Sequence, residues 1–479
     1  MQMTEDLIRT VVQQVLSQMQ MGGSVPATRG DGEVAARRPG TLGVYPTADA
    51  AVTAAAAAFE QYRRRPLGDR KKAVACIRTI CADQAEELGR REFEETGIGR
   101  LDHKIAKLRD VIPLIPGVES LRTDNDSGDD GISLTDYTPF GVLGAITPVT
   151  HSLPTLAGNA INMLASGNTV VFNPHPAGAT VAAEGVRRFN KAIREAIGIE
   201  DVLTIIDPPT PESASALFDH KGVRLLVVTG GPAVARAALA STRRAIVAGP
   251  GNPPVVVDAT ACLENAARSI VAGAAFDNNL LCIGEKQVFA VSEIFDTLME
   301  AVGRHGGFRL NSAQIDALTT TAFVRGDDGA LHVGKDLIGK DPAVLGQAAG
   351  VDVPPGTQIL YGETGAEHPF VAHEQMMPFL PFVRVPNVDR AIALAKESEH
   401  GYGHTAILHS RDSSVMSKMG KLMDCTLFVI NGPCFAGLGL GGEGQPSFSI
   451  AGPTGEGVTT PLTFCRRRRS SLVGGLRFV

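Results

Sequence analysis

The sequence predicts an α/β protein built on parallel sheets. Short apolar runs without polar alternation, such as 169–172 and 223–228, are separated by segments with helical spacing. Strands that are apolar on both faces are typical of parallel sheets covered by helices on both sides. The chain has 479 residues, of which 44% are hydrophobic, so it is long enough for one to three lobes. Such sheets bind ligands at the carboxyl ends of their strands.

The composition excludes several classes of protein. The net charge of −6 gives no electrostatic case for binding nucleic acid or an acidic membrane. Seven cysteines without a CxxC pair argue against a zinc site or a disulfide framework and favour a reducing compartment. No apolar run reaches membrane-spanning length, and the acidic start does not resemble a secretory signal. We therefore expect a cytoplasmic protein with no metal, nucleic-acid or membrane partner.

Residues 1–20 predict an amphipathic helix with one apolar stripe. Residues 21–40, rich in Gly, Pro, Ala and Arg, are typical of a linker. A short helix on such a linker either folds back on its own domain or docks on a partner. We favour the partner, because a helix docked on its own domain needs no long linker.

The first half of the chain then shows helical patterns followed by alternating strands and helices. Helices are expected at 48–65, 69–96 and 100–116, and a protruding hairpin or loop at 121–137. Strands are expected at 142–146, 169–172, 202–206 and 223–228. The helices between and after these strands are expected at 153–165, 179–196, 212–220 and 232–243.

The second half repeats this alternation of strands and helices, which predicts a second α/β lobe. Strands are expected at 255–257, 286–291 and 427–430, and the chain ends on a strand-like tail. Helices are expected at 261–275, 294–302, 388–396 and 414–422. The polar loop 276–285 joins a helix to a strand, so it would lie near the cleft between the lobes.

Cys282 lies in this polar, glycine-flanked loop, Phe276 to Glu285. A thiol at a helix-to-strand junction can be exposed and can attack a carbonyl when part of it is thiolate. A small buried side chain is the usual alternative for a cysteine, but these neighbours favour a reactive thiol. Thr229 to Pro232 follows an apolar strand and opens a helix, where backbone N–H groups could receive a pyrophosphate. An ordinary strand-to-helix turn is the alternative there.

Together, five motifs resemble the aldehyde dehydrogenase superfamily, and within it the coenzyme-A-acylating branch. They are Thr147 to His151, Gly167 to Pro176, Thr229 to Pro232, the Cys282 loop, and His373 to Pro378. Within this branch, the motifs resemble the propionaldehyde and acetaldehyde dehydrogenases of bacterial microcompartments. This resemblance implies a homo-oligomer. It also implies that residues 1–20 bind a shell or cargo protein in the microcompartment lumen.

The resemblance also divides the chain into a Rossmann-type cofactor domain, an α/β catalytic domain and a small oligomerisation arm. It places cofactor binding at 41–120 and 138–248, catalysis at 249–440, a return segment at 441–465, and oligomerisation elements at 121–137 and 466–479. Arg466 to Arg469 would either meet coenzyme A phosphates or form a solvated charge run beside an oligomer interface.

The resemblance gives each candidate site residue a role. Cys282 is the expected nucleophile, with a low pKa, and His151 stands where acylating relatives usually have an oxyanion-binding Asn. Asn159 is a second donor candidate, and Cys434 and His404 are expected to line the substrate pocket, although His404 could instead serve packing. The expected cofactor-binding residues are Thr147, Pro148, Asn173, Pro174, His175, Thr229, Gly230, Gly231 and Glu374. The expected cofactor is NAD, with NADP left open, and coenzyme A is the co-substrate.

One departure from hydrolytic relatives favours acyl transfer. Those relatives activate water with a glutamate, whereas the matching stretch here, 246–251, has no carboxylate. Water without a base is a poor acceptor for a thioester, while a thiol needs less help. We therefore expect a short aldehyde, propionaldehyde or acetaldehyde, to become an acyl thioester on Cys282 and then acyl-coenzyme A. The alternatives are a hydrolytic dehydrogenase with its acid elsewhere, an acyl phosphate reductase, and an inactive shell-associated scaffold.

Overall fold

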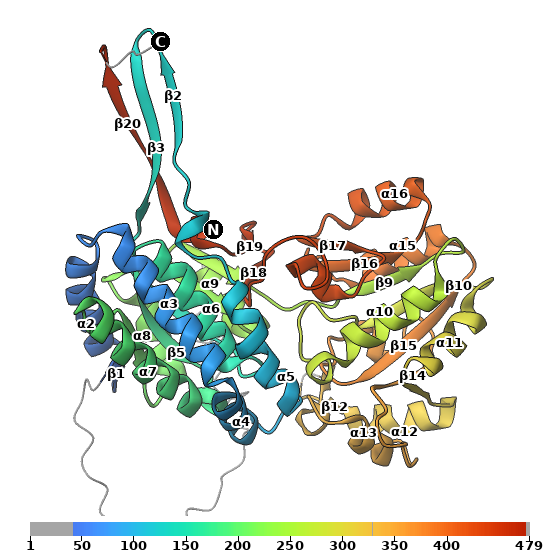
Figure 1. The fold of residues 1–479 in the computed structure, drawn as a ribbon. Helices are drawn as coiled ribbons and strands as arrows, with labels where there is room; N and C mark the ends of the chain where they lie inside the picture. The colour runs from blue at the N-terminus through green and yellow to red at the C-terminus, as the bar shows by residue number, and fades with distance from the viewer. Residues whose placement is uncertain (1–41, 328, 476–479) are drawn as a thin grey trace, which may run out of the picture.

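The computed structural model describes residues 42–327 and 329–475 of the chain. The predicted helix at 1–20 and the linker at 21–40 lie outside these residues. Figure 1 shows two α/β lobes side by side, with a long β arm projecting from the first lobe. Each lobe is built on its own sheet, and both sheets are parallel throughout, so the predicted fold class is confirmed.

The first lobe holds a six-stranded sheet of order β1-β6-β5-β4-β7-β8. The strands are β1 (Val44–Tyr45), β4 (Val142–Thr147), β5 (Thr169–Pro174), β6 (Leu203–Ile206), β7 (Val223–Thr229) and β8 (Ala245–Ala248). Strands β4, β5 and β6 are fully buried, because helices cover both faces. After β6 the chain returns across the sheet to β7, so the order reverses between β4 and β7. Such a switch point is where these sheets bind ligands.

The helices of the first lobe largely follow the predicted ranges. They are α2 (Ala48–Tyr62), α3 (Leu67–Asp83), α4 (Ala85–Thr96), α5 (Leu101–Ala106), α6 (Ser152–Ala165), α7 (Ala179–Ile197), α8 (Pro211–Asp219) and α9 (Pro232–Ala240). The prediction of one helix over 69–96 is wrong, because Gln84 leaves the helical region with φ −110° and ψ 17°. The pattern at 100–116 becomes α5, a π turn and a 3₁₀ turn, where Pro113 lacks the N–H that an α-helix needs.

The second lobe holds a seven-stranded sheet of order β11-β14-β15-β10-β9-β16-β17. The strands are β9 (Pro254–Val257), β10 (Gln287–Val291), β11 (Gly307–Arg309), β14 (Ile359–Glu363), β15 (Phe379–Val385), β16 (Thr405–His409) and β17 (Leu427–Ile430). The helices are α10 (Leu263–Ala275), α11 (Phe295–Arg304), α12 (Ser312–Ala322), α13 (Pro342–Ala348), α14 (Pro369–Ala372), α15 (Val388–Ser398) and α16 (Ser413–Met423). A short antiparallel pair, β12 (Phe323–Arg325) and β13 (Leu331–Val333), lies beside α12.

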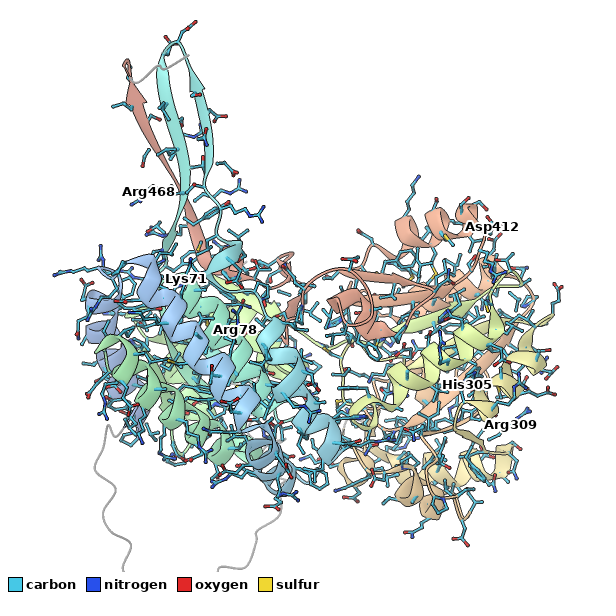
Figure 2. All side chains as sticks on the ribbon, in the orientation of Figure 1. Lys71, Arg78, His305, Arg309, Asp412 and Arg468 are labelled. Atoms are coloured by element: carbon cyan, nitrogen blue, oxygen red, sulfur yellow. The ribbon has the colours of Figure 1, made fainter. Side chains whose placement is uncertain are left out.

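The arm is an antiparallel sheet of β2 (Asp124–Gly128), β3 (Gly131–Pro139) and β20 (Cys465–Val473). The hairpin predicted at 121–137 is thereby confirmed, and β20 is the strand predicted in the tail. Arg468 projects from this arm, and its guanidinium pairs with Asp136 across the two strands at 2.6 Å (Figure 2). The return segment carries the short pair β18 (Ile450–Ala451) and β19 (Gly457–Val458). Its side chains join both cores, Ala451 that of the first lobe and Ile450 that of the second.

Within residues 42–327 and 329–475, no helix combines the length and the apolar character that crossing a membrane requires.

Candidate active site

Three predicted cofactor segments meet at the carboxyl edge of the first sheet. Thr147, Pro174 and Thr229 each end one of three neighbouring strands, β4, β5 and β7. Thr147 and Pro174 are direct partners in the parallel register, and the N–H of His175 donates to the Thr147 carbonyl oxygen at 2.9 Å. Pro148 follows β4 and is partly exposed. The buried Thr147 hydroxyl has no partner within the described chain, so it is available to a ligand at this edge.

The glycines after β7 lie where a bound phosphate would need them. Gly231 caps the N-terminus of α9, and a Cβ added there would have no heavy atom within 4 Å. The N–H of Gly230 is already used, because it donates to the Ala248 carbonyl oxygen at 3.2 Å. An open backbone at the positive end of a helix suits a pyrophosphate. Across the edge, Asn173 accepts a hydrogen bond from the Ser213 hydroxyl at 2.6 Å. These residues fit a dinucleotide cofactor.

The loop that carries Cys282 begins with three left-handed residues. Asp277, Asn278 and Asn279 have φ values of 51°, 54° and 63°. This backbone region is sparsely populated except by Gly, Asn and Asp. The side chains of these three residues are buried, and each makes hydrogen bonds that hold the turn. The loop is therefore fixed by its surroundings.

Contacts from both lobes hold this turn. The backbone N–H and the guanidinium of Arg100, in the first lobe, donate to Asp277 at 2.8 Å and to Asn278 at 2.6 Å. From the second lobe, the buried Lys286 ammonium donates to the backbone carbonyls of Asn279 at 2.7 Å and Leu281 at 3.1 Å. Cys282 is thereby presented at the junction of the two lobes.

Gly251 is the point where Cys282, His404 and Glu374 come together. A Cβ added at Gly251 would lie 2.5 Å from the Cys282 carbonyl oxygen and 3.0 Å from Cγ of His404. The Gly251 N–H also donates to the Glu374 carboxylate, and this hydrogen bond opposes the effect of burial, which raises the pKa of Glu374. The stretch 246–251, which carries no carboxylate, therefore contacts the thiol loop directly through Gly251.

The structure contradicts the expected low pKa of Cys282, because the surroundings of the thiol raise its pKa above the ordinary value. Burial raises the pKa of Cys282 to about 12, and the nearby Glu374 carboxylate adds to this, while Lys286 opposes it. Burial likewise raises the pKa of Glu374 to about 7, against the Lys286 charge. A sequence pattern does not show how deeply a thiol is buried or which charges surround it.

We expect Glu374→Gln to lower the thiol pKa, because the carboxylate no longer opposes the thiolate. Alkylation of Cys282 by iodoacetamide, followed by mass spectrometry of its peptide, should become about tenfold faster at pH 8. The difference should vanish below pH 7, where wild-type Glu374 is itself protonated. An exposed control, Glu300→Gln, should leave the rate unchanged. Equal rates for Glu374→Gln and wild type at pH 8 would show that the two groups do not interact.

His151 lies in a buried cluster of charges between the lobes. Its Nδ1 is 2.8 Å from the Lys107 ammonium, which also bonds Asp277. The Lys104 ammonium lies 3.4 Å from both Asp277 and Glu92. Burial, together with the two lysines, lowers the pKa of His151 well below its usual value, so the imidazole is neutral. Lys107 joins His151 to Asp277, which stands five residues before Cys282 in the same loop, so the cluster lies at the base of the thiol loop.

The other predicted pocket residues are buried around this site. Asn159 on α6 accepts from the Ser449 hydroxyl at 2.9 Å, and its amide nitrogen has no partner in the described residues. The His404 ring donates or accepts through Nδ1 at the Thr405 hydroxyl, 2.8 Å away, and its buried Nε2 is unpartnered in that part of the chain. Burial, helped by Lys286, lowers the pKa of His404 to about 4, so this ring is neutral.

Cys434 is the more deeply buried of the two candidate thiols. Its side chain has no exposed surface, and its backbone N–H donates to the Glu285 carboxylate at 2.9 Å. Burial and Glu285 raise the pKa of Cys434 well above its usual value. Cys434 is therefore the less reactive of the two.

The arginine run lies away from the cofactor edge. Arg466 and Arg468 line a cavity of about 830 Å³ at the base of the arm, together with Val142 and Arg224. Val142 begins β4 and Arg224 lies near the start of β7, so this cavity is at the opposite end of the strands from Thr147 and Thr229. The position favours a solvated charge run over contacts with coenzyme A phosphates.

The cluster around Asp277 was not predicted from the sequence, although a signal was present. Lys104 and Lys107 stand in one helical stripe with Leu108 and Val111. Cations at apolar positions of such a stripe indicate burial, and a buried cation needs an anion. Asp277 itself carries no pattern, since its partners come from another lobe.

Comparison with known proteins agrees with this geometry. Residues 37–307 match the model of the aldehyde dehydrogenase family. The chain is 44% identical to an acetylating acetaldehyde dehydrogenase of Salmonella typhimurium over 91% of this chain and 94% of the relative. A Rhodopseudomonas palustris propionaldehyde dehydrogenase, solved with coenzyme A and an acylated cysteine, superposes with a TM-score of 0.87 at 44% identity, over 90% of this chain and 98% of that one. A propionaldehyde dehydrogenase of a Clostridium phytofermentans fucose utilisation bacterial microcompartment gives a TM-score of 0.88 at 38% identity, over 91% of this chain and 100% of that one.

Proposed function

The chain belongs to the aldehyde dehydrogenase family, and from this premise we propose that it is a coenzyme-A-acylating enzyme that oxidises a short aldehyde with NAD. The observation that carries the proposal is the stretch 246–251, which closes on Cys282 without a carboxylate. Relatives named for acetylating and propanoylating activity support it, and so does the neighbour with an acylated cysteine and coenzyme A. Propionaldehyde is the favoured substrate, and acetaldehyde is the second.

The residues of the chain divide the work of the reaction. Cys282 adds to the aldehyde carbonyl once its thiol loses a proton, and the Lys286 charge favours the thiolate. The Cys282 N–H and the His151 ring stabilise the oxygen of the adduct. Thr147, Pro174 and Gly231 would hold NAD at the carboxyl edge of the first sheet, where the cofactor would supply the acceptor for the hydride. Cys282 then holds the acyl group as a thioester, and the coenzyme A thiol displaces it, which regenerates the Cys282 thiol.

A hydrolytic dehydrogenase is the second candidate, because one observation favours it. Glu374 is a carboxylate close enough to raise the pKa of Cys282, and burial brings its own pKa to about 7. A base with that pKa can activate water at neutral pH. Glu374 is also the residue expected to bind the nicotinamide ribose, and a bound dinucleotide would then occupy its carboxylate.

The test is NADH formation from propionaldehyde with and without coenzyme A. We expect steady turnover only with coenzyme A, since no other acceptor is activated at the thioester. Absorbance at the NADH band measures the rate, and replacing coenzyme A by orthophosphate tests acyl phosphate chemistry. Steady turnover without coenzyme A, lost in Glu374→Gln, would identify the hydrolytic enzyme instead.

In this proposal, residues 1–20 are a targeting segment that binds a microcompartment shell or cargo protein. Support comes from the apolar stripe on a long linker and from the neighbour that belongs to a microcompartment. Deleting residues 1–20 should leave turnover intact and abolish co-purification with shells. A deletion variant that still co-purifies, or that no longer folds, contradicts this role.

The arm, in the same proposal, joins copies of the chain into a homo-oligomer. Leu134, Leu472 and Val473 are exposed apolar side chains on its strands, which a second copy would cover.

A further inference from the structure

The contact between Lys107 and His151 has a consequence for the state of the imidazole ring. The Lys107 ammonium lies 2.8 Å from Nδ1 of His151. A charged lysine has three N–H donors and no lone pair. Nδ1 must therefore accept this hydrogen bond, and the single proton of the neutral ring must be on Nε2.

The opposite side of the ring is free for a ligand. His151 keeps 6% of its surface exposed. Among residues 42–327 and 329–475, the hydrogen-bond contact of this ring is made by Nδ1, with Lys107, and involves no atom at Nε2. The ring packs at a tilt against Phe448, with ring centroids 6.0 Å apart. An N–H at Nε2 is thus available to an oxygen that enters the site beside Cys282.

We propose that Lys107 is a positioning residue that holds His151 in the tautomer whose Nε2–H donates to the aldehyde oxygen. This inference rests on the proposed function, because the aldehyde oxygen is the acceptor. Without Lys107, a neutral imidazole divides between two tautomers, and the one with the proton on Nδ1 presents a lone pair to the developing oxyanion. A lone pair there repels the charge that the site must stabilise.

The surrounding charges keep both partners in the required state. Burial lowers the pKa of Lys107 to about 8, while Asp277 opposes this, so the lysine is mostly charged at neutral pH. The charged or titratable groups around the pair are Glu92 from α4, His103 and Lys104 from α5, Asp277 from the thiol loop, and Lys286 before β10. When Lys107 loses its proton at higher pH, its nitrogen can accept from Nδ1, and the control of the tautomer is lost.

His151→Asn separates this role from a merely structural one. An amide nitrogen donates without any tautomer, so this variant should not depend on Lys107. We expect Lys107→Met to lower kcat for coenzyme-A-dependent propionaldehyde oxidation about 100-fold in the wild-type background, with little change in KM. In the His151→Asn background, the same change should lower kcat less than about threefold. Lys104→Met is the matched control: it removes a lysine of the same cluster that does not touch His151, so any loss should be equal in both backgrounds.

A pH profile gives an independent readout in two proteins that keep Lys107. Both proteins share the titration of the Cys282 thiol, so the ratio of the wild-type kcat to the kcat of His151→Asn should fall above pH 8. This profile decides the question if Lys107→Met fails to fold. Three results would overturn the proposal. They are equal losses from Lys107→Met in both backgrounds, no loss in either background, and a ratio of the two kcat values that does not change across pH 8. Failure of the proposed function is distinguishable, because wild type would then show no coenzyme-A-dependent turnover at all.

Discussion

Replacing Cys282 with alanine is expected to lower coenzyme-A-dependent aldehyde oxidation by about 10⁴-fold or more, as is usual when a covalent nucleophile is removed. Cys282 is held at the lobe junction by the left-handed turn before it and by the Lys286 ammonium after it. Among the described residues, Cys282 is the only cysteine in the loop between α10 and β10. Single-turnover NADH formation measures the loss, since it reports hydride transfer before acyl transfer.

Two control variants make this result specific. Cys262→Ala removes an exposed thiol outside the site and should keep full turnover. Cys434→Ala tests the second candidate thiol, and NADH formation should persist, because Cys434 is fully buried against Glu285. Loss of NADH formation in Cys434→Ala, with activity retained in Cys282→Ala, would reverse the assignment of the nucleophile.

Asp277→Asn is expected to destabilise the folded chain by about 3–5 kcal/mol, because it leaves two buried lysines without their shared anion. Lys107 bonds the Asp277 carboxylate directly, and Lys104 lies 3.4 Å from it. Urea unfolding followed by far-UV circular dichroism measures the change in free energy of unfolding. Asp296→Asn is the matched control, because its partner Arg384 lies in an exposed ion pair, where only a small change is expected.

The same carboxylate makes stability depend on acid pH. Burial alone would raise the pKa of Asp277, but the charges of Lys107 and Lys104 outweigh it and hold the pKa well below its usual range. The stabilisation is therefore fully present above the unfolded-state pKa of about 4 and is lost as the pH falls below it. In Asp277→Asn this acid-dependent loss should be smaller than in wild type. An unchanged slope between pH 4 and pH 2 would mean that Asp277 is not the group responsible.

Regular local patterns made much of the fold predictable. The strand over 223–228 and the helix over 179–196 are visible because a buried strand is continuously apolar and an amphipathic helix repeats every 3.6 residues. The break at Gln84 was missed because helical spacing continues across it. Strands β14, β15 and β16 were also missed.

In the candidate site too, local motifs were predictable and contacts between distant residues were not. Cys282 and Gly231 were singled out from the pattern of their loops, and Thr147 from the resemblance of its motif to a known family. The pairing of Lys107 with Asp277 and His151 joins positions 107, 151 and 277, which are far apart in the sequence. Such contacts depend on how the two lobes meet. The pKa of Cys282 depends on Glu374 and Lys286 in the same non-local way.

The most direct test of the account is the intact mass of the enzyme after incubation with propionaldehyde and NAD in the absence of coenzyme A. We predict one added propionyl group, located on Cys282 by peptide mapping. The group should persist in water for many turnover times and be discharged at once when coenzyme A is added. An enzyme that gains no acyl group, that carries it elsewhere, or that loses it to water as fast as to coenzyme A would contradict the account.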